Sequence, residues 1–483
     1  MNPRDAGEVG DGITLRAAPA VVVSERTDGG LRFESSDTML ELPELSPALR
    51  AALWELAGSG ATETALADQV LQAEGPSTLP TLHLALLRLG TARLLSYELR
   101  LDNQPLMALR ATSRAFAPPH FRVNRGGRYQ LSRFACLRRR GSEWVMESPL
   151  AHGELVLQDG RAYSWVWQLS VPRRGEELAT SLPGSSGTTG LEMLMLLCSA
   201  GLAGELNTAG ELEEENSVLL KQWSFHELLF HTRSRRGLHA HPSGATGRFR
   251  GQLAPLPALK PRMSDQIVAL HRPDLERLQR QEPSFTRVLE ERRSIRDYTG
   301  RVLTSRMVGE FLYRACRVKE RQEGRDYELT RRPYPGAGAG YELEVYLASA
   351  RCDGLEPGLY HYAPEAHELH RLPDPRGAAQ WLLEEARHSA ALPEVPPMLI
   401  ILSARFSRIF WRYESVGYAL LLKDVGVLLQ TMYLVATAMG LAPCALGAGD
   451  SDCFARATGL DFRAESSVGE FLLGGALEMR STL

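Results

Sequence analysis

Three arginines and a serine stand within five positions of the chain, as Arg292, Arg293, Ser294 and Arg296. Arg292, Ser294 and Arg296 alternate, so an extended turn can present two guanidinium groups and a hydroxyl on one side. A planar guanidinium donates paired hydrogen bonds to phosphate oxygens, which makes this arrangement a good match for a phosphate. An isolated basic pentapeptide is more often a solvated surface, so the interpretation depends on the rest of the chain.

Two further segments follow this basic cluster in the sequence. The first is rich in small residues and runs through Pro335, Gly336, Ala337, Gly338, Ala339, Gly340, Tyr341, Glu342, Leu343 and Glu344. The second, residues 358–364, reads Gly-Leu-Tyr-His-Tyr-Ala-Pro. Arg-Arg-Ser-Ile-Arg at 292–296 resembles the opening motif of nitroreductase-like flavoenzymes. The other two segments resemble the Pro-Ser-Ala-Gly-Ala-x-Tyr-Pro-x-Glu segment and the Gly-Leu-Tyr-x-Tyr hairpin of one branch, the SagB-type azoline dehydrogenases, which oxidise thiazolines and oxazolines to thiazoles and oxazoles.

The resemblance implies an FMN cofactor. Azoline aromatisation removes two electrons and two protons, and no amino-acid side chain accepts a hydride. In the family, the Arg-x-Ser-x-Arg residues hold the phosphate and the ring edge of FMN, a Gly-punctuated loop lies beside the ring, and a late basic residue often closes the phosphate site. The cofactor contacts expected on this basis are Arg292, Arg293, Ser294, Arg296, Pro335, Gly336, Ala337, Gly338, Leu446, Gly447 and Arg480.

The resemblance also indicates which residues handle the proton. Azoline dehydrogenases place a Lys-Tyr pair just ahead of a long central helix, and the matching residues here are Arg412 and Tyr413. The tyrosine is kept, but the lysine is replaced by an arginine, which is not deprotonated in a protein. Tyr413 is therefore the expected catalytic base, with Arg412 as a cation that lowers its pKa. An ordinary arginine stacked on a core-facing tyrosine is the alternative.

Other positions also depart from the branch. Ala419 and Val427 stand where its members have Arg and His, and Gly336 stands where they have Ser. The favoured function is FMN-dependent oxidation of azoline rings in a ribosomal or carrier-bound peptide during natural-product biosynthesis, with a cyclodehydratase-type protein as a partner. Two alternatives stay open: a non-catalytic scaffold or recognition subunit of a peptide-modifying complex, and an NAD(P)H-dependent nitroreductase.

The elements expected to position these residues form an α+β, nitroreductase-like FMN domain over residues 263–483, with a mixed sheet flanked by helices. One continuous helix is predicted over residues 275–292, so that it ends at the basic cluster. Residues 418–439 form a long apolar segment, but Lys423, Asp424 and Gln430 interrupt it, which favours a buried helix over a membrane span. The family builds its flavin site at a homodimer interface, and this helix is apolar on enough sides to be covered by a partner.

Before this domain, the pattern predicts two tandem winged-helix-like modules, residues 1–115 and 116–245, and a Gly- and Pro-rich linker, residues 246–262. Predicted helices at 46–58, 62–71 and 81–89, followed by a strand, give the order of a winged helix, and a similar order recurs further on. Three segments have sequences that resemble the N-terminal region of the longer azoline dehydrogenases: residues 131–135, 147–150 and 223–237. In those enzymes, such modules are linked to handling a peptide substrate.

Composition narrows the remaining classes. The chain has 483 residues, 44% of them hydrophobic, which is enough for two or three globular domains. A net charge of −3 argues against nucleic-acid and membrane-surface binding. Six scattered cysteines and an N-terminus without a secretory signal fit a reduced cytoplasmic protein with neither disulfides nor a zinc site. His226 and His231 are five residues apart and do not share a helical face, so no metal site is expected from them.

Overall fold

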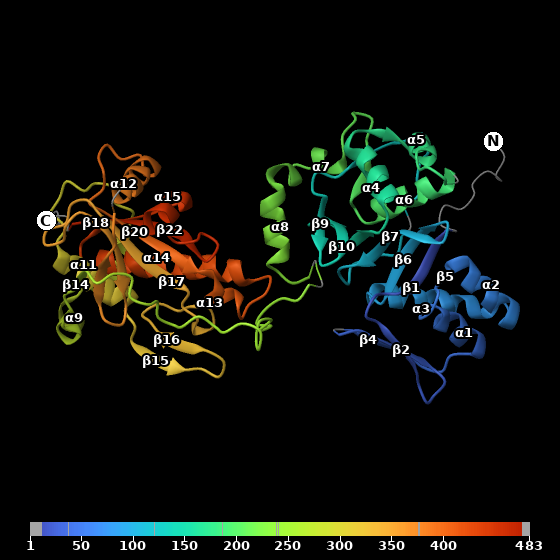
Figure 1. Cartoon of the computed structure of the whole chain (residues 1–483), viewed down its shortest axis with the longest axis horizontal. Helices are drawn as coiled ribbons and strands as arrows, with labels where there is room; N and C mark the ends of the chain where they lie inside the picture. The colour runs from blue at the N-terminus through green and yellow to red at the C-terminus, as the bar shows by residue number, and fades with distance from the viewer. Residues whose placement is uncertain are drawn as a thin grey trace. The chain divides into compact units, whose positions relative to one another are not determined.

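The structure is a computed structural model in which the chain forms two compact units, Met1–His241 and Pro242–Leu483 (Figure 1). Each unit has its own hydrophobic core, and the C-terminal unit has one core on each face of its sheet. The residues that the structure describes are 12–36, 38–119, 121–185, 187–237, 239, 241–374 and 377–475.

A seven-stranded antiparallel sheet runs through the N-terminal unit. Its order is β5 (Ala61–Thr62), β1 (Ile13–Ala17), β6 (Leu95–Leu101), β7 (Gln104–Ala111), β11 (Gly153–Leu157), β10 (Glu143–Glu147) and β9 (Cys136–Arg140). The pairing of β7 with β11 sets Leu109 opposite Leu155. The sheet therefore continues across residue 115, where the sequence pattern divides two modules.

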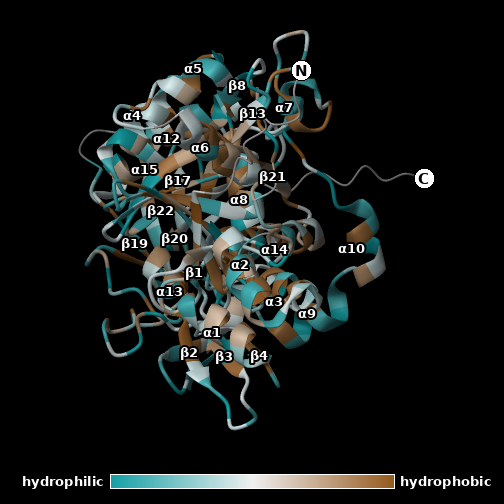
Figure 2. Cartoon of the chain, turned by 90° about the vertical axis from the view of Figure 1, so that its right-hand side faces the viewer, coloured by the Kyte–Doolittle hydropathy of each residue, from teal (hydrophilic) through white to brown (hydrophobic). Residues whose placement is uncertain are grey.

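Two groups of three helices pack with this sheet around a single core. The first group is α1 (Pro47–Glu55), α2 (Glu63–Glu74) and α3 (Leu79–Thr91), and the second is α4 (Gly160–Trp167), α5 (Gly175–Thr180) and α6 (Gly187–Ser199). The apolar residues along α3, seen in brown in Figure 2, include the buried Leu82, Leu86 and Leu89. The first group corresponds to the helices predicted at 46–58, 62–71 and 81–89, but the strands expected in separate modules pair with one another, so the two groups share one core.

The remaining elements of this unit are short. A three-stranded sheet contains β2 (Val22–Glu25), β3 (Leu31–Glu34) and β4 (Met39–Leu42). A second small sheet has the order β12 (Arg173–Arg174), β8 (Arg128–Leu131) and β13 (Ala203–Glu205). The chain then forms α7 (Glu213–Asn216) and α8 (Phe225–Arg233), the latter started by Ser224, whose hydroxyl accepts a hydrogen bond from Glu227 N.

The C-terminal unit contains the second seven-stranded sheet. Its order is β14 (Ile267–Ala269), β19 (Glu368–Arg371), β18 (Gly358–Ala363), β17 (Leu343–Ser349), β20 (Met398–Arg405), β22 (Glu465–Gly474) and β21 (Ala442–Leu446). Every neighbouring pair is antiparallel. The α+β class and the Gly358 hairpin are confirmed. The expectation of a mixed sheet is wrong, because the connections place every strand beside neighbours that run in the opposite direction.

Helices cover both faces of this sheet, which explains why β17 and β20 are apolar without alternation. On one face, α11 (Ser305–Cys316) and α14 (Gly417–Ala438) close a core that includes Phe311, Leu428 and Phe471. On the other face, α12 (Ala378–Ser389) and α15 (Ser451–Thr458), which lie near each other in Figure 1, close a core that includes Tyr346 and Phe454. A two-stranded hairpin, β15 (Glu320–Glu323) and β16 (Glu328–Arg331), leads into the Gly-rich segment.

Helix α14 is long and apolar enough to cross a membrane, as the only such helix among the described residues. Its Leu421, Val425, Leu428 and Met432 are buried in the core beside α11. This packing covers one side of the helix, and 39% of its apolar stretch is buried in the single chain, so the prediction of a buried helix holds for that side only. The opposite side of α14 is open in the single chain, where Tyr418 and Leu422 are about two-fifths exposed, at 41% and 40%.

The continuous helix predicted before the basic cluster is divided in two, which corrects the expectation. The structure has α9 (Leu275–Gln281) and α10 (Phe285–Glu291), separated at Pro283. Proline lacks the N–H that a helix interior needs, so the chain stops and restarts there. The Ser284 hydroxyl accepts a hydrogen bond from Arg287 N at 3.4 Å and begins α10.

Residues 242–262, which include the linker predicted at 246–262, belong to the C-terminal unit and are bonded to its other residues. Gly244 and Glu414 form an antiparallel bridge, Trp411 Nε1 donates to the carbonyl of Leu253 at 2.7 Å, and Arg408 Nη1 donates to the carbonyl of Leu256 at 2.7 Å. These contacts recognise backbone atoms of the segment. Its sequence therefore carries no pattern from which they could be predicted.

Candidate functional site

The basic cluster is fixed between α14 and β21. Ser294 Oγ and Tyr433 Oη are hydrogen-bonded at 2.7 Å, and Ile295 N donates to the carbonyl of Pro443 at 2.8 Å. Tyr433 Oη also accepts from Ala445 N at 2.7 Å, next to Leu446. The structure thus brings the predicted phosphate-binding residues close to the end of β21, where the predicted flavin loop begins.

The arginines of this cluster carry charge that the described residues do not neutralise. Among the described residues, no carboxylate forms an ion pair with Arg292, Arg293 or Arg296. The Arg292 guanidinium lies 5.3 Å from the centre of the Tyr433 ring, while Arg293 and Arg296 are exposed. Three cations without counter-charges at one turn suit a phosphate, so the donor set fits the anionic end of FMN.

The Gly-rich segment forms a tight turn, the single 3₁₀ turn Ala337–Ala339, which directly follows Pro335 and Gly336. Gly338 has φ of 55°, and a Cβ added there would lie 2.5 Å from both Arg412 Nη1 and Tyr413 Oη. Only glycine combines this conformation with so close an approach. The structure therefore brings the predicted cofactor turn and the predicted catalytic pair together.

Arg412 is held in place by its neighbours. Its Nη1 donates to Tyr327 Oη at 2.6 Å and to the carbonyl of Gly338 at 3.2 Å. The hydrogen bond to Tyr327 raises the pKa of Arg412 above its ordinary value, so the guanidinium stays charged. Its carbon lies 5.3 Å from the centre of the Tyr413 ring, within the range of a cation–π contact.

The pKa of Tyr413 moves in the opposite direction to the one expected from the sequence. Burial raises it above 10, and the charge of Arg412 offsets this only in part. Tyr413 therefore keeps its proton at neutral pH and needs another group to take a proton from it before it can accept one.

Two carboxyl groups beside this turn were not identified as site residues from the sequence. Asp424 Oδ2 accepts a hydrogen bond from Ala337 N at 2.8 Å, so the Ala337 amide is already occupied. Glu342 is hydrogen-bonded to Asp424, and both carboxyl groups act electrostatically on Tyr413. Two features of the sequence could have identified them. Glu342 replaces the second proline of the family motif, and Asp424 is an acidic residue inside the apolar run of α14.

The predicted residues form two groups along α14. Asp424 of this helix contacts the group that contains the Gly-rich turn and Tyr413, and Tyr433 contacts the group that contains the basic cluster. These two residues are nine positions apart in the helix, which corresponds to about 14 Å along the axis. A single chain thus presents the two groups at separate points of the helix.

The predicted flavin loop follows β21. Leu446 lines a cavity of about 180 Å³ together with Ala448, Glu470 and other residues of α12 and α15. A Cβ at Gly447 would meet no atom within 4 Å, so the backbone is open on this side. Arg480 lies outside the described residues.

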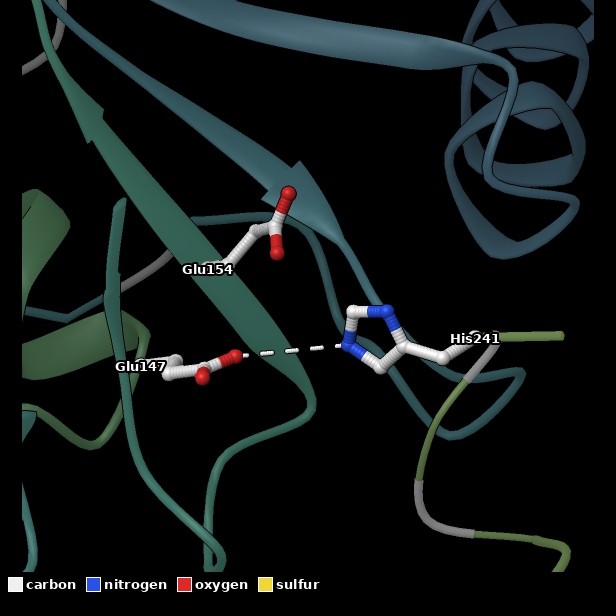
Figure 3. A group of neighbouring side chains, drawn as sticks. All are labelled: Glu147, Glu154 and His241. Atoms are coloured by element: carbon white, nitrogen blue, oxygen red, sulfur yellow. Dashed lines mark ion pairs between the residues drawn. The ribbon is translucent and has the colours of Figure 1, made fainter. Parts of the chain in front are cut away.

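A third polar cluster, in the N-terminal unit, has the residue types of a metal site. Ligand atoms of Glu147, Glu154 and His241 lie within 4.8 Å of one another (Figure 3). However, Glu147 forms ion pairs with Arg138 and Arg233, and Arg140 donates to both carboxylate oxygens of Glu154 at 2.5 and 2.7 Å.

The charges of this cluster argue against a metal ion. Burial raises the pKa of Glu147, but the hydrogen bond from Arg138 and the charge of Arg233 hold it below its ordinary value. Burial and Arg233 lower the pKa of His241 to about 4, so the ring is neutral. Because three arginines surround two carboxylates, a divalent cation would meet a net positive charge. His226 and His231 are exposed on α8, and His231 stacks on Trp223.

Comparison with known families divides the chain in the same way as the fold. The family model described as cyanobactin oxidase ThcOx matches residues 129–240. The model of the nitroreductase family matches residues 289–475.

Two curated relatives agree with these matches. A nitroreductase-like protein of Methanocaldococcus jannaschii is 31% identical over 183 residues, which is 36% of this chain and 82% of that protein. The microcin B17-processing protein McbC of Escherichia coli is 29% identical over 115 residues, which is 23% of this chain and 42% of McbC.

Solved structures also align with the chain. A nitroreductase-like protein of Ralstonia eutropha is 19% identical, with a TM-score of 0.34, and the match covers 47% of this chain and 96% of that one. The E. coli microcin synthetase McbBCD complex with truncated pro-MccB17 bound contains a chain that is 20% identical, with a TM-score of 0.34, and the match covers 48% and 91% of the two chains.

Proposed function

The chain belongs to the nitroreductase family, as an oxidoreductase of its azoline dehydrogenase branch, and from this premise we propose that it uses FMN to oxidise thiazoline or oxazoline rings in a peptide to thiazoles or oxazoles. The observation that carries the proposal is the approach of Arg412 and Tyr413 to Gly338, which sets the predicted proton-handling pair against the predicted cofactor turn. The relative McbC is a peptide-processing protein, which supports a peptide substrate.

The cofactor contacts that we propose follow the two groups along α14. Arg292, Arg293 and Arg296 neutralise the phosphate, and Ser294 and Gly338 line the space beside it and the ring. Pro335, Gly336, Ala337, Leu446, Gly447 and Arg480 complete the proposed contact set. FMN, when bound, supplies the acceptor for two electrons that no side chain can provide.

The chain's own residues handle the proton and the orientation of the substrate. Azoline aromatisation releases one hydride equivalent and one proton, and the proton must go to a group of the protein or to water. Tyr413, which keeps its proton at neutral pH, donates a hydrogen bond to the ring and passes protons on. Arg412 is fixed by Tyr327 and Gly338, and it orients Tyr413 without exchanging a proton itself.

A homodimer with FMN at its interface completes this proposal. Within one chain, the basic cluster and the Gly-rich turn are separated by about 14 Å along α14, so a second copy can bring a turn to each basic cluster. Tyr418 and Leu422 on α14, with Phe285 and Leu289 on α10, are exposed apolar side chains suited to such an interface. Sedimentation of the flavin-loaded protein as a monomer would contradict the dimer.

The substrate side involves the N-terminal unit. We propose that its two helical groups, the tandem winged-helix-like modules of the sequence analysis, bind the peptide, and that a cyclodehydratase-type protein supplies the azoline. All six cysteines are free, which fits the reducing cytoplasm that we propose as the location.

Mass spectrometry tests this function directly. A cyclised peptide incubated with the protein and FMN in air should lose two hydrogens per azoline ring. A colourless protein that binds no flavin and leaves the rings unchanged would support a scaffold. Bleaching of the flavin by NAD(P)H alone, without azoline oxidation, would support a nitroreductase.

A further inference from the structure

Glu342 and Asp424 form a buried carboxyl pair beside the Gly-rich turn. Glu342 is only 1% exposed and Asp424 is 8% exposed, and their side chains are hydrogen-bonded to each other. Asp424 projects from α14 and anchors Ala337 N, whereas Glu342 immediately precedes β17 and its carbonyl accepts from Arg405 N at 2.9 Å. Two carboxylates this close cannot both ionise easily, so the pair retains a proton.

The pair has unused capacity for hydrogen bonding. Glu342 Oε1 is buried, and apart from the Asp424 carboxyl no hydrogen-bond partner reaches it among the described residues. An unpaired buried oxygen is costly unless another group reaches it. The titratable groups that act on Glu342 are Asp424, Arg332, Tyr334 and Tyr413, and only Arg332 is positively charged. Arg412 and Tyr327 complete the charged and titratable surroundings of Tyr413.

The pair stands where the chain departs twice from the family motifs. Position 342 carries a glutamate in place of the second proline of the Pro-Ser-Ala-Gly-Ala-x-Tyr-Pro segment, and position 412 carries an arginine in place of the lysine. Both departures lie against the same turn, because Arg412 contacts Gly338 while Glu342 bonds to Asp424, which holds Ala337. One titratable group has been lost on one side of the turn and another gained on the other side.

We propose that the Glu342–Asp424 pair replaces the missing lysine as the proton acceptor of azoline oxidation and acts through Tyr413. The proposal rests on the proposed function and names the residues that take the proton in this chain. Glu342 and Asp424 are positioning residues in this scheme, since Tyr413 is the group that meets the substrate.

The proton balance of this step closes. The azoline ring gives its proton to the Tyr413 oxygen as Tyr413 gives its hydroxyl proton to the pair, directly or through one water. The pair changes from a singly charged, hydrogen-bonded anion to two neutral carboxyl groups, and it later releases that proton to solvent. The hydride equivalent goes to the flavin of the proposed function, so the ring loses two electrons and two protons in all.

The first test compares activity profiles on the full-length, FMN-loaded protein. Glu342→Gln should lower kcat/KM for azoline oxidation by about tenfold or more and remove the limb of its pH profile that reports loss of the proton shared by the pair, because Asp424 alone cannot share a proton with a second carboxyl. Arg412→Lys added to Glu342→Gln should restore most of the rate, since a lysine can again lose a proton. Glu414→Gln is the matched control, as its carboxylate bonds to Thr246 and faces Arg248.

The second test needs no catalysis. Burial and Asp424 raise the pKa of Glu342 to about 8, from about 4.5 for a free carboxyl. Between these two values the folded protein keeps a proton that the unfolded chain has lost, so this stabilisation is complete below pH 4.5 and disappears as the pH rises toward 8. The unfolding constant of the wild type, divided by that of Glu342→Gln, should rise by up to tenfold per pH unit in this window.

The outcomes separate the two proposals. An unchanged pH profile and rate in Glu342→Gln, with an active wild type, overturns the pair while leaving azoline oxidation intact. A pH-independent ratio of unfolding constants also overturns it, because the pair then does not hold the extra proton. A wild type that binds FMN but oxidises no azoline at any pH overturns the proposed function, whatever the stability data show.

Discussion

In the N-terminal unit, buried Glu147 and Glu154 each face arginines. In the C-terminal unit, buried Glu342 and Asp424 face each other, and the arginines of the basic cluster pair with none of the described carboxylates. Both regions contain acidic residues and arginines. In the first, every charge has a counter-charge within the fold. In the second, positive charge and proton affinity remain available to something outside the chain.

This difference distinguishes structural from functional charge. Removing one member of a neutralised buried pair leaves the other unpaired, so its main consequence is loss of stability. Charges without partners add little to folding, and their removal should be felt in binding and reaction. Each prediction below removes a charge or titratable group in one region and asks whether stability or function responds.

The largest effect is expected from Arg292→Ala with Arg296→Ala. Neither guanidinium group pairs with a carboxylate in the part of the chain that the structure describes, so their loss should spare folding while weakening FMN binding about a thousandfold, given roughly 1.5–3 kcal/mol for each hydrogen bond to a charged group. Flavin content after purification and the unfolding midpoint measure the two effects.

The matched control is Arg321→Ala with Arg331→Ala, because these arginines pair with Glu328 and Glu320 of the β15–β16 hairpin. It should retain the flavin. Full retention of FMN by the Arg292 and Arg296 double variant would instead remove the phosphate assignment.

The next effect is expected in the N-terminal unit, from Glu147→Ala. The side chain of Glu147 is 6% exposed and bonds to Arg138 and Arg233, so its loss leaves two cations without a partner and should cost about 3 kcal/mol of unfolding free energy. Denaturant unfolding measures this loss. Glu143→Ala, which removes a carboxylate that is 36% exposed, should cost less than about 1 kcal/mol. Equal costs would show that burial does not set the difference.

Tyr413→Phe should lower azoline oxidation by about a hundredfold while flavin stays bound, in line with the usual contribution of a positioned acid or base. The substitution removes only the hydroxyl beside Gly338 and leaves the ring against Arg412. Steady-state oxidation with the flavin spectrum as a check measures it. A rate equal to that of the wild type would mean that the proton leaves by another route.

The smallest effect is expected from metal removal. Glu147, Glu154 and His241 resemble a ligand set, but the three arginines around them oppose a cation. Dialysis against a chelator should therefore leave metal content, activity and the unfolding midpoint unchanged. A stoichiometric metal found by elemental analysis would show that the ion pairs between these arginines and the carboxylates break to admit it.

The sequence predicted the parts of the site that depend on local motifs. The basic cluster, the Gly-rich turn and the Arg412–Tyr413 pair were identified because each occupies a few consecutive positions with an unusual composition. Arrangement in space was harder to predict. Glu342 and Asp424 are 82 residues apart in the sequence and meet only because α14 lies beside the start of β17.

The fold shows the same contrast. The Gly358 hairpin and the helix of residues 418–439 were predicted, since periodicity and turn residues specify them locally. The prediction of a mixed sheet was wrong because the direction of a strand depends on the path of the segments that connect it to its neighbours. The single sheet of the N-terminal unit was missed because β7 meets β11 only after an intervening segment of more than forty residues. The net direction of the Tyr413 pKa depends on burial, which the residue type alone does not reveal.

The contacts of residues 242–262 indicate which positions of this segment can vary between homologues. Arg408 and Trp411 bind carbonyl oxygens of this segment, and Gly244 meets Glu414 through backbone atoms, so nearly any residue types there could make the same bonds. Arg248, Arg250 and Arg262 also pair with carboxylates, but these side chains are 43–63% exposed, whereas the side chain of Lys260 is 11% exposed and reaches Glu465 at 2.5 Å. The segment can therefore diverge widely between homologues while following the same path, and constraint within it should concentrate at position 260.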